Sequence, residues 1–310
     1  MILNQLTVFF MTIYLLVSLT IIVQSSIIVA VLSREWVQVK RLSPVDMILI
    51  SLGVCRFCLQ WSSVLYNFCY YFNPDDDLWY IAVIWEFTNT LAFWLTSLLA
   101  VVYYVKVSSF TYAIFLWLRW RILSLVPWLL LGSLMISCVT IIVSALRFVF
   151  IKSQLISMMQ LPGNNTETEK LRTFLEKNYV HQLLATSFIP FLLFLTSTIL
   201  LIASLCQHLR QIRHHDTGHS NFSMKAHATA LRFLAFFLIF FTSYFLTITI
   251  FTTYNLRHTS YWFWAGETII YTTVSIHLTS LMLSSPTLKK VLKVSCCDPK
   301  LPEAPGTAIP

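Results

Sequence analysis

The sequence has little charge: Asp, Glu, Lys and Arg make up 11% of its 310 residues, while 57% are hydrophobic. Soluble domains carry about 25% charged and about 45–50% apolar residues, so an ordinary soluble domain is excluded. A disordered chain, which combines low hydrophobicity with high net charge, is excluded as well. With 6 Gly and 10 Pro, the chain is not collagen-like or of low complexity. The composition is that of a polytopic membrane protein.

The sequence also lacks the cysteine pattern of a disulfide framework. Its 7 cysteines are scattered, and the segment 147–180 contains none. Cys296 and Cys297 follow a lysine-rich stretch near the C-terminus. Palmitoylation of this pair and two unmodified thiols agree equally well with the pattern. No internal repeat is visible, so the inverted-repeat architecture of many transporters has no support.

Long apolar runs are what the chain has in abundance. A helix needs about 20 mainly apolar residues to cross the ~30 Å hydrocarbon core of a membrane, and seven stretches meet this requirement. We therefore expect an all-α bundle of seven transmembrane helices. The predicted spans are 7–32, 45–69, 80–105, 122–146, 181–207, 228–254 and 262–285.

The positions of Lys and Arg predict the orientation, because cytoplasmic loops carry an excess of both. With the N-terminus outside, inner segments hold 14 of the 21 basic residues, and outer segments hold 6. The net charge of +8 thus reflects topology, and we expect a lipid bilayer and no nucleic acid as partner. The predicted parts are a receptor bundle at 1–286 with outer loops 70–79, 147–180 and 255–261, inner loops 33–44, 106–121 and 208–227, and a cytoplasmic tail at 287–310.

Two glycosylation sequons provide an independent test of this orientation. Asn164 lies in the longest expected outer loop, where an acceptor asparagine reaches the lumen. Asn221 begins a second sequon in a loop expected to be cytoplasmic. We expect a glycan on Asn164 and none on Asn221.

Several seven-helix classes lack a residue that they require. The span 262–285 has no lysine for a retinal Schiff base. A zinc hydrolase needs about three converging ligands, whereas His181 and His277 lie near opposite ends of different spans. The histidine-rich loop 208–227 is more typical of a solvated segment than of a metal site. No nucleophile-elbow, phosphate-loop or paired-cysteine motif is present, so neither an enzyme nor a cofactor is expected.

A receptor is the remaining class, and here the sequence resembles a known family. The sequence lacks the Asp-Arg-Tyr and Asn-Pro-x-x-Tyr motifs of rhodopsin-like receptors. Instead it resembles the type 2 taste receptors, the bitter receptors, over nearly its whole length. This resemblance implies a multi-pass plasma-membrane receptor that couples to a G protein. The matching stretches are 46–52, Arg56, 59–61, 115–122, 190–191, 200–205, 225–232, His277 and 285–289.

A few positions depart from the family pattern. Gln24 replaces the usual Asn of the first span, Ser285 replaces an Asn of the last span, and Leu278 follows His277. Gln24 and Ser285, with the segments 5–10 and 280–286, resemble the family member that responds to β-glucopyranosides such as salicin. The resemblance therefore implies small-molecule glycosides as ligands.

Two acids within spans indicate where a ligand would bind. Ionisable residues inside a membrane are costly and mark functional sites, and Glu86 and Glu267 lie five or six residues inside the expected outer ends. The spacing of Trp85, Glu86, Asn89 and Phe93 (i, i+1, i+4 and i+8) predicts that they share one helix face. A few polar groups among aromatic ones are typical of small-molecule sites. With the residues that the resemblance adds, the predicted ligand site is Trp85, Glu86, Asn89, Phe93, His181, Phe245 and Glu267.

Simpler interpretations of these residues stay open. Trp85 is also typical of an interfacial aromatic belt, and Glu86 and Asn89 of structural hydrogen bonds between helices. Each phenylalanine can be ordinary packing. The alternative function is a seven-helix small-solute transporter that uses Glu86 and Glu267.

The expected cytoplasmic face carries the signalling residues. The resemblance implies a gustducin-type heterotrimeric G protein, leading to phospholipase C and calcium signalling. Arg56, with Gln24, Ser284 and Ser285 as expected polar partners, is assigned to a structural switch. Positive-inside topology and attraction to anionic lipid explain the basic residues equally well. The residues predicted to face the G protein are Tyr103, Tyr104, Lys106, Arg119 and Arg121.

Overall fold

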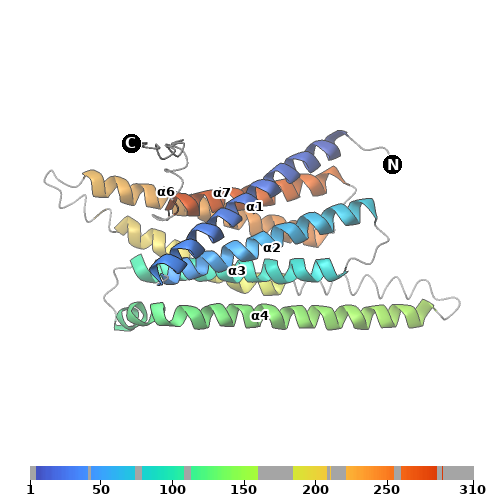
Figure 1. Ribbon diagram of the computed structural model, residues 1–310, viewed down its shortest axis with the longest axis horizontal. Helices are drawn as coiled ribbons and strands as arrows, with labels where there is room; N and C mark the ends of the chain where they lie inside the picture. Colours follow the sequence, from blue (N-terminus) through green and yellow to red (C-terminus); the bar gives the residue numbers. More distant parts are fainter. Residues whose placement is uncertain are drawn as a thin grey trace, which may run out of the picture.

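The computed structural model describes residues 5–40, 43–73, 79–107, 113–159, 184–207, 210, 221–254, 260–284 and 288. This part of the chain is helical, and a helix covers each predicted span wherever its residues are described (Figure 1). The all-α, seven-helix prediction is confirmed. The helices are α1 (Gln5–Val39), α2 (Pro44–Phe72), α3 (Trp79–Val107), α4 (Ala113–Met159), the helix Leu184–Gln207, α6 (Asn221–Tyr254) and α7 (Tyr261–Ser284).

The beginning of α2 shows how sequence sets a helix boundary. Ser43 has an extended backbone, with φ −64° and ψ 141°, and Pro44 starts the first turn. Proline favours this position, because its missing N–H would have no helical partner there and its fixed φ suits the helix. Asp46 in the same turn places a negative side chain at the positive end of the helix dipole.

Helix α4 is much longer than its predicted span. It has 47 residues, about 70 Å at 1.5 Å per residue, whereas its apolar stretch is Ser124–Leu146. Helical residues therefore reach into the segments 106–121 and 147–180 that we expected to be loops, and α6 begins inside the expected loop 208–227. Polarity marks where a helix leaves the membrane, not where it ends. Pro127 lies within α4, as proline can in membrane helices.

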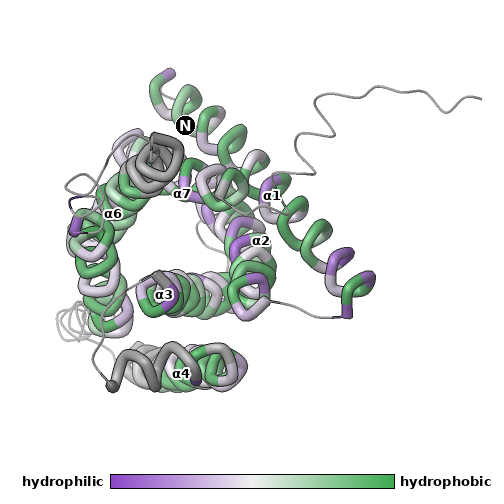
Figure 2. The backbone as a smooth tube through the Cα atoms, turned by 90° about the vertical axis from the view of Figure 1, so that its left-hand side faces the viewer, coloured by the Kyte–Doolittle hydropathy of each residue, from purple (hydrophilic) through white to green (hydrophobic). Residues whose placement is uncertain are grey.

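The helices pack as a bundle around a shared interior. Helix α1 packs against α2 and α7, α2 against α3, α3 against α4, and α6 against α7. Figure 2 looks along the bundle and shows α2, α3, α6 and α7 around the interior, with α4 outside α3. The helix Leu184–Gln207 reaches this interior through Phe191, whose ring stacks on Phe245 of α6 with 4.0 Å between the ring centroids.

One glycine permits the close approach of α1 and α2. A Cβ added to Gly53 would lie 2.9 Å from Val29 Cγ2, a distance that forces a shift. Small residues let membrane helices approach in this way.

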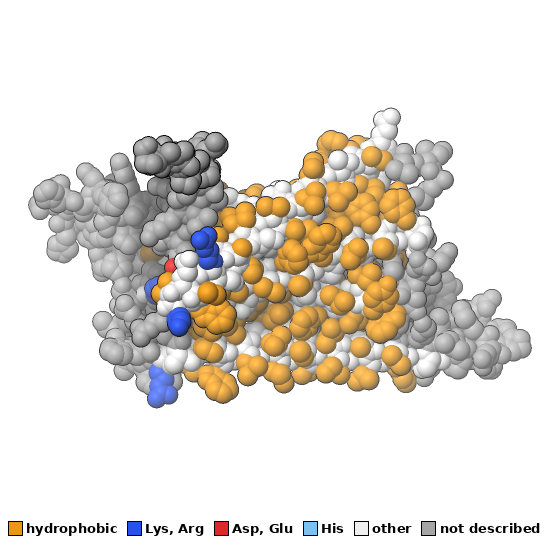
Figure 3. Space-filling model, in the orientation of Figure 1, with side chains coloured by type: hydrophobic (Ala, Val, Ile, Leu, Met, Phe, Trp, Pro, Cys, Tyr) orange, Lys and Arg blue, Asp and Glu red, His pale blue; other side chains and the backbone are white. Residues whose placement is uncertain are grey.

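The outer surface separates apolar from basic residues. Hydrophobic side chains cover the middle of the face in Figure 3, and the Lys and Arg side chains visible there lie at one end. Exposed Arg34 and Lys40 near the end of α1 and Lys106 near the end of α3 belong to what we call the inner end, after the predicted orientation. The opposite end, with Gln5, Trp79 and Tyr261, is the outer end.

Candidate functional site

A hydrogen-bonded group of polar side chains lies towards the outer end, between α1, α2, α3 and α7. Tyr271 Oη donates to Ser63 Oγ at 2.7 Å, and Tyr14 Oη lies 3.0 Å from the same oxygen. Asn67 Nδ2 donates to Tyr14 Oη at 3.3 Å. Trp85 Nε1 contacts Tyr271 Oη at 3.5 Å. With Glu267, these residues form the outer polar cluster: Tyr14, Ser63, Asn67, Trp85, Glu267 and Tyr271.

The outer polar cluster accommodates one of the two predicted acids. Asn67 Nδ2 donates to Glu267 Oε2 at 2.9 Å. A carboxylate inside a membrane is costly unless it is hydrogen-bonded, and α2 supplies this donor. The second oxygen gives the cluster an acceptor that suits a ligand hydroxyl.

Glu86, the other acid, faces a different helix. It is 3% exposed, and its Oε1 accepts a hydrogen bond from Ser144 Oγ of α4 at 2.7 Å. The structure therefore does not bring Glu86 and Glu267 together, and the shared face expected for Trp85 and Glu86 divides between α7 and α4. Adjacent helical residues do not face the same neighbour. A transporter site built from both acids loses its basis.

Asn89 and Phe93 continue along α3 towards the bundle centre. Asn89 Oδ1 accepts from Tyr244 Oη at 2.8 Å, while its Nδ2 has no hydrogen-bond partner among the described residues. Phe93 lies with its ring centroid 5.3 Å from those of Phe241 and Tyr244. Phe245 completes this aromatic wall from α6. The amide of Asn89 therefore has hydrogens to offer a ligand.

A small cavity lies deeper, at the middle of the bundle. Its empty volume is about 380 Å³ including the mouth, and only about 20 Å³ of it can hold the centre of a water-sized molecule. Among the predicted ligand-binding residues, Phe93 alone lines this central cavity. The lining residues are Arg56, Leu59, Ala92, Phe93, Thr96, Phe237, Phe240, Phe241, Tyr244, Thr273, Val274 and His277.

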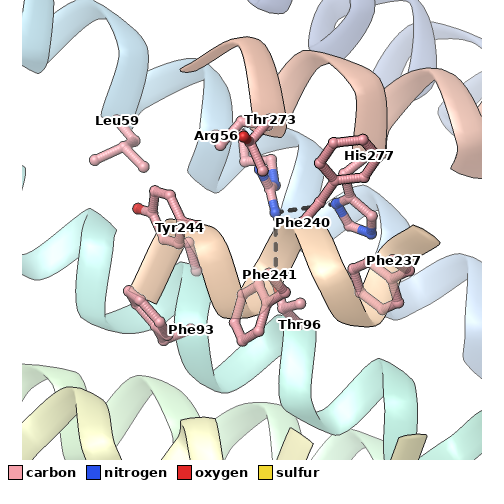
Figure 4. A pocket seen from close by; sticks show the side chains of 12 residues that line it. Arg56, Leu59, Phe93, Thr96, Phe237, Phe240, Phe241, Tyr244, Thr273 and His277 are labelled. Carbon is pink, nitrogen blue, oxygen red and sulfur yellow. Dashed lines mark hydrogen bonds between the residues drawn. The ribbon is translucent and has the colours of Figure 1, made fainter. Parts of the chain in front are cut away.

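Arg56 points into the central cavity, as Figure 4 shows. One guanidinium nitrogen, Nη2, lies 3.2 Å from His277 Nδ1 and 3.5 Å from Thr96 Oγ1. The ring of Phe237 stacks on His277 at 4.1 Å. Arg56 therefore links α2 to α3 and α7 at one depth.

Gln24, one of the three expected partners of Arg56, bonds other residues. Gln24 instead donates to Thr279 Oγ1 at 3.0 Å and accepts from Ser275 Oγ at 3.3 Å, so it fastens α1 to α7 independently. Ser285 and the side chain of Ser284, the other two expected partners, lie outside the described part of the chain. Hydropathy locates Arg56 within a span but does not determine which neighbour its long side chain reaches.

The predicted signalling residues lie at the inner end where they are described. Lys106 and Arg121 are exposed, Tyr103 is half-buried and Tyr104 is buried. The other predicted positions lie outside the described residues or side chains: Arg119, His181, Asn164, Cys296 and Cys297.

Sequence reasoning missed four members of the outer polar cluster: Tyr14, Ser63, Asn67 and Tyr271. The distance of a residue from the outer end of its helix is the signal that could have identified one of them. Asn67 lies six residues before the C-cap Asn73 of α2, and Glu267 lies six residues after the first residue of α7. Both helices meet the outer end there, so the amide and the carboxylate lie at the same level.

The family to which this chain belongs follows from the seven-helix fold and from sequence comparison with known proteins. Residues 1–299 match the taste receptor protein family (TAS2R), and the chain belongs to this family. It is thus a multi-pass plasma-membrane receptor of the G-protein-coupled, seven-helix type, with small molecules as ligands. The family prediction is confirmed.

Similarity to individual proteins locates the chain more closely within the family. The chain is 61% identical to taste receptor type 2 member 16 of Pan troglodytes over 292 residues, which are 94% of this chain and 99% of that protein. It is 60% identical to the Homo sapiens protein of that name, with the same coverage. It is 51% identical to the Mus musculus protein over 298 residues, 96% of this chain and 98% of that protein. These similarities support a bitter taste receptor.

Proposed function

We propose that this bitter taste receptor responds to β-glucopyranosides bound near the outer polar cluster, with its N-terminus outside and its C-terminus in the cytoplasm. The observation that carries the proposal is the Asn67–Glu267 hydrogen bond beside Trp85 and Tyr271. Sugar hydroxyls need both donors and acceptors, and an aromatic ring can lie against the apolar face of a pyranose. The cluster offers both kinds of group within a mostly apolar surround.

We assign the residues of the site different roles. Glu267 and Asn89 are the polar contacts, because one has a second carboxylate oxygen and the other has amide hydrogens to offer. Trp85 is the aromatic contact. Glu86, bonded to Ser144, holds α3 against α4 and positions the site. Phe93 and Phe245 form its inner wall, and His181 is its proposed member at the start of the fifth span.

A calcium-flux assay on cells that display the receptor tests the ligand site. Trp85→Ala, Asn89→Ala and Glu267→Gln each remove one proposed contact, and each lost hydrogen bond costs about 1–3 kcal/mol. We therefore expect the half-maximal salicin concentration to rise by roughly 5- to 150-fold.

Trp128→Ala serves as the matched control. Trp128 lies on α4 with 71% of its surface exposed, towards lipid and away from the outer polar cluster. Its truncation should leave the response unchanged at equal surface expression. Wild-type responses from all three site variants would refute the proposed site.

For the intracellular step, we propose a gustducin-type G protein that meets Tyr103, Tyr104, Lys106, Arg119 and Arg121, with phospholipase C and calcium signalling downstream. The exposure of Lys106 and Arg121 at the inner end supports this. A transducer of this type would need a basic, accessible surface there.

A further inference from the structure

The central cavity contains a permanent positive charge at mid-membrane depth. Arg56 is 5% exposed and lies near the middle of α2, twelve residues from Pro44. An arginine side chain does not lose its proton in proteins. A buried charge is strongly unfavourable unless something compensates it.

The neighbours of Arg56 are electrically neutral. Within the described part of the chain its guanidinium bonds the hydroxyl of Thr96 and the ring of His277, and none of the twelve residues that line the cavity is an acid. Its Nε–H has no hydrogen-bond partner in the described part of the chain. The guanidinium therefore has a positive charge that no described neighbour neutralises and an N–H donor that no described neighbour accepts.

The described acids are too far away to supply the missing charge. Asp46 precedes Arg56 on α2 by ten residues, and Glu35 of α1 lies near Asp46. Glu86 precedes Thr96 on α3 by ten residues, and Glu267 precedes His277 on α7 by ten. Ten helical residues span about 15 Å. Glu86 and Glu267 are also engaged by Ser144 and Asn67.

His277 adds a second donor to the cavity lining. Arginine has no acceptor, so His277 Nδ1 must accept from Arg56, and the proton of the neutral ring is then on Nε2. This Nε2 also has no partner among the described residues. His277 is 6% exposed.

We propose that the central cavity binds a small monovalent inorganic anion, such as chloride, as the counter-ion of Arg56. The free space of the cavity suits a single small ion or one water molecule. The guanidinium provides charge and an unused N–H donor. Phe93, Phe237 and Phe241 keep bulk water away, and the positive edges of aromatic rings tolerate an anion.

Thermal unfolding of the purified receptor in detergent tests this site. The midpoint is measured in sodium chloride and in sodium gluconate at equal ionic strength, because gluconate is too large for the cavity. A ligand that binds the folded state raises the midpoint as its concentration increases, so we expect a saturable shift of a few degrees in chloride. Equal midpoints in the two salts would overturn the proposal and leave a cavity that holds only water.

Two variants locate the effect. Arg56→Met removes the charge, and Arg34→Met removes an exposed arginine of α1 as its control. Ala92→Leu keeps Arg56 but fills the cavity, since Ala92 lines it and is 7% exposed. We expect Arg34→Met to keep the chloride shift and the other two to lose it.

Ala92→Leu decides the outcome if Arg56→Met does not fold. A chloride shift that survives in Ala92→Leu contradicts a site in this cavity. Binding of radioactive chloride to the wild-type receptor, displaced by bromide and absent from Ala92→Leu, is the direct confirmation. None of these measurements involves a glycoside or a G protein, so they stand apart from the test of the ligand site.

Discussion

At the scale of single residues, the polar side chains inside the bundle connect helices. Asn67 is the clearest case, because its amide bonds Tyr14 of α1 and Glu267 of α7 from its position on α2. One side chain thereby holds three helices at one level. Its removal leaves the Glu267 carboxylate without its α2 donor.

Asn67→Leu should therefore destabilise the receptor. Asn67 is 4% exposed, and a buried polar partner left unsatisfied costs about 1–3 kcal/mol. We expect a lower unfolding midpoint and less receptor at the cell surface, measured by thermal unfolding and by antibody staining. Cys58→Leu changes an exposed position of the same helix and should have little effect; equal losses from both variants would contradict this role.

The neighbouring helix that each side chain contacts was the least predictable part of the site. Trp85 and Glu86 were assigned to one face, but they bond to α7 and α4. Arg56 bonds to Thr96 and not to Gln24. Sequence spacing gives the angle between side chains on one helix, whereas the rotation of that helix against its neighbours depends on packing throughout the bundle.

At the scale of helices, hydropathy was a reliable guide to the spans. The bilayer requires about 20 apolar residues at each crossing, and this requirement is visible in sequence. The ends of α4 and α6 were not predictable, because a helix satisfies its backbone hydrogen bonds in water as well as in lipid. Polar residues beyond Leu146 therefore marked a loop where the backbone remains helical to Met159.

Gly53 provides a test of the α1–α2 contact. In Gly53→Ala the new methyl group would meet Val29 Cγ2 at 2.9 Å, and valine is stiff in a helix. We expect a loss of about 1–3 kcal/mol, seen as a lower unfolding midpoint.

Gly132→Ala is the matched control for that prediction. Nothing lies within 4 Å of a Cβ at Gly132 of α4, and alanine favours a helix over glycine by up to about 1 kcal/mol. This variant should be neutral or stabilising. A destabilisation equal to that of Gly53→Ala would mean that close packing is not the reason.

At the scale of the whole molecule, the distribution of charge predicts the orientation. A glycosidase should increase the gel mobility of the receptor from mammalian cells, and Asn164→Gln should abolish this shift. Asn221→Gln should leave it intact, because that sequon belongs to the expected cytoplasmic side. A shift that persists in Asn164→Gln would refute the orientation.

The inner end gives a second prediction at this scale. Arg119→Ala with Arg121→Ala should weaken ligand-evoked G-protein activation by about tenfold or more, since hydrogen bonds to charged groups are worth about 1.5–3 kcal/mol. Nucleotide exchange on an added G protein measures this at equal surface expression. Arg34→Ala, which removes one exposed charge from α1, is the comparison; normal activation by the double variant would assign both arginines to topology and lipid contact.

The length of α4 has a consequence for the outside of the cell. From Leu146 to Met159 the helix continues for thirteen residues, about 20 Å, beyond its apolar stretch. In the proposed orientation this helical extension carries Met159, the last described residue of α4, outward from the apolar stretch and away from the lipid.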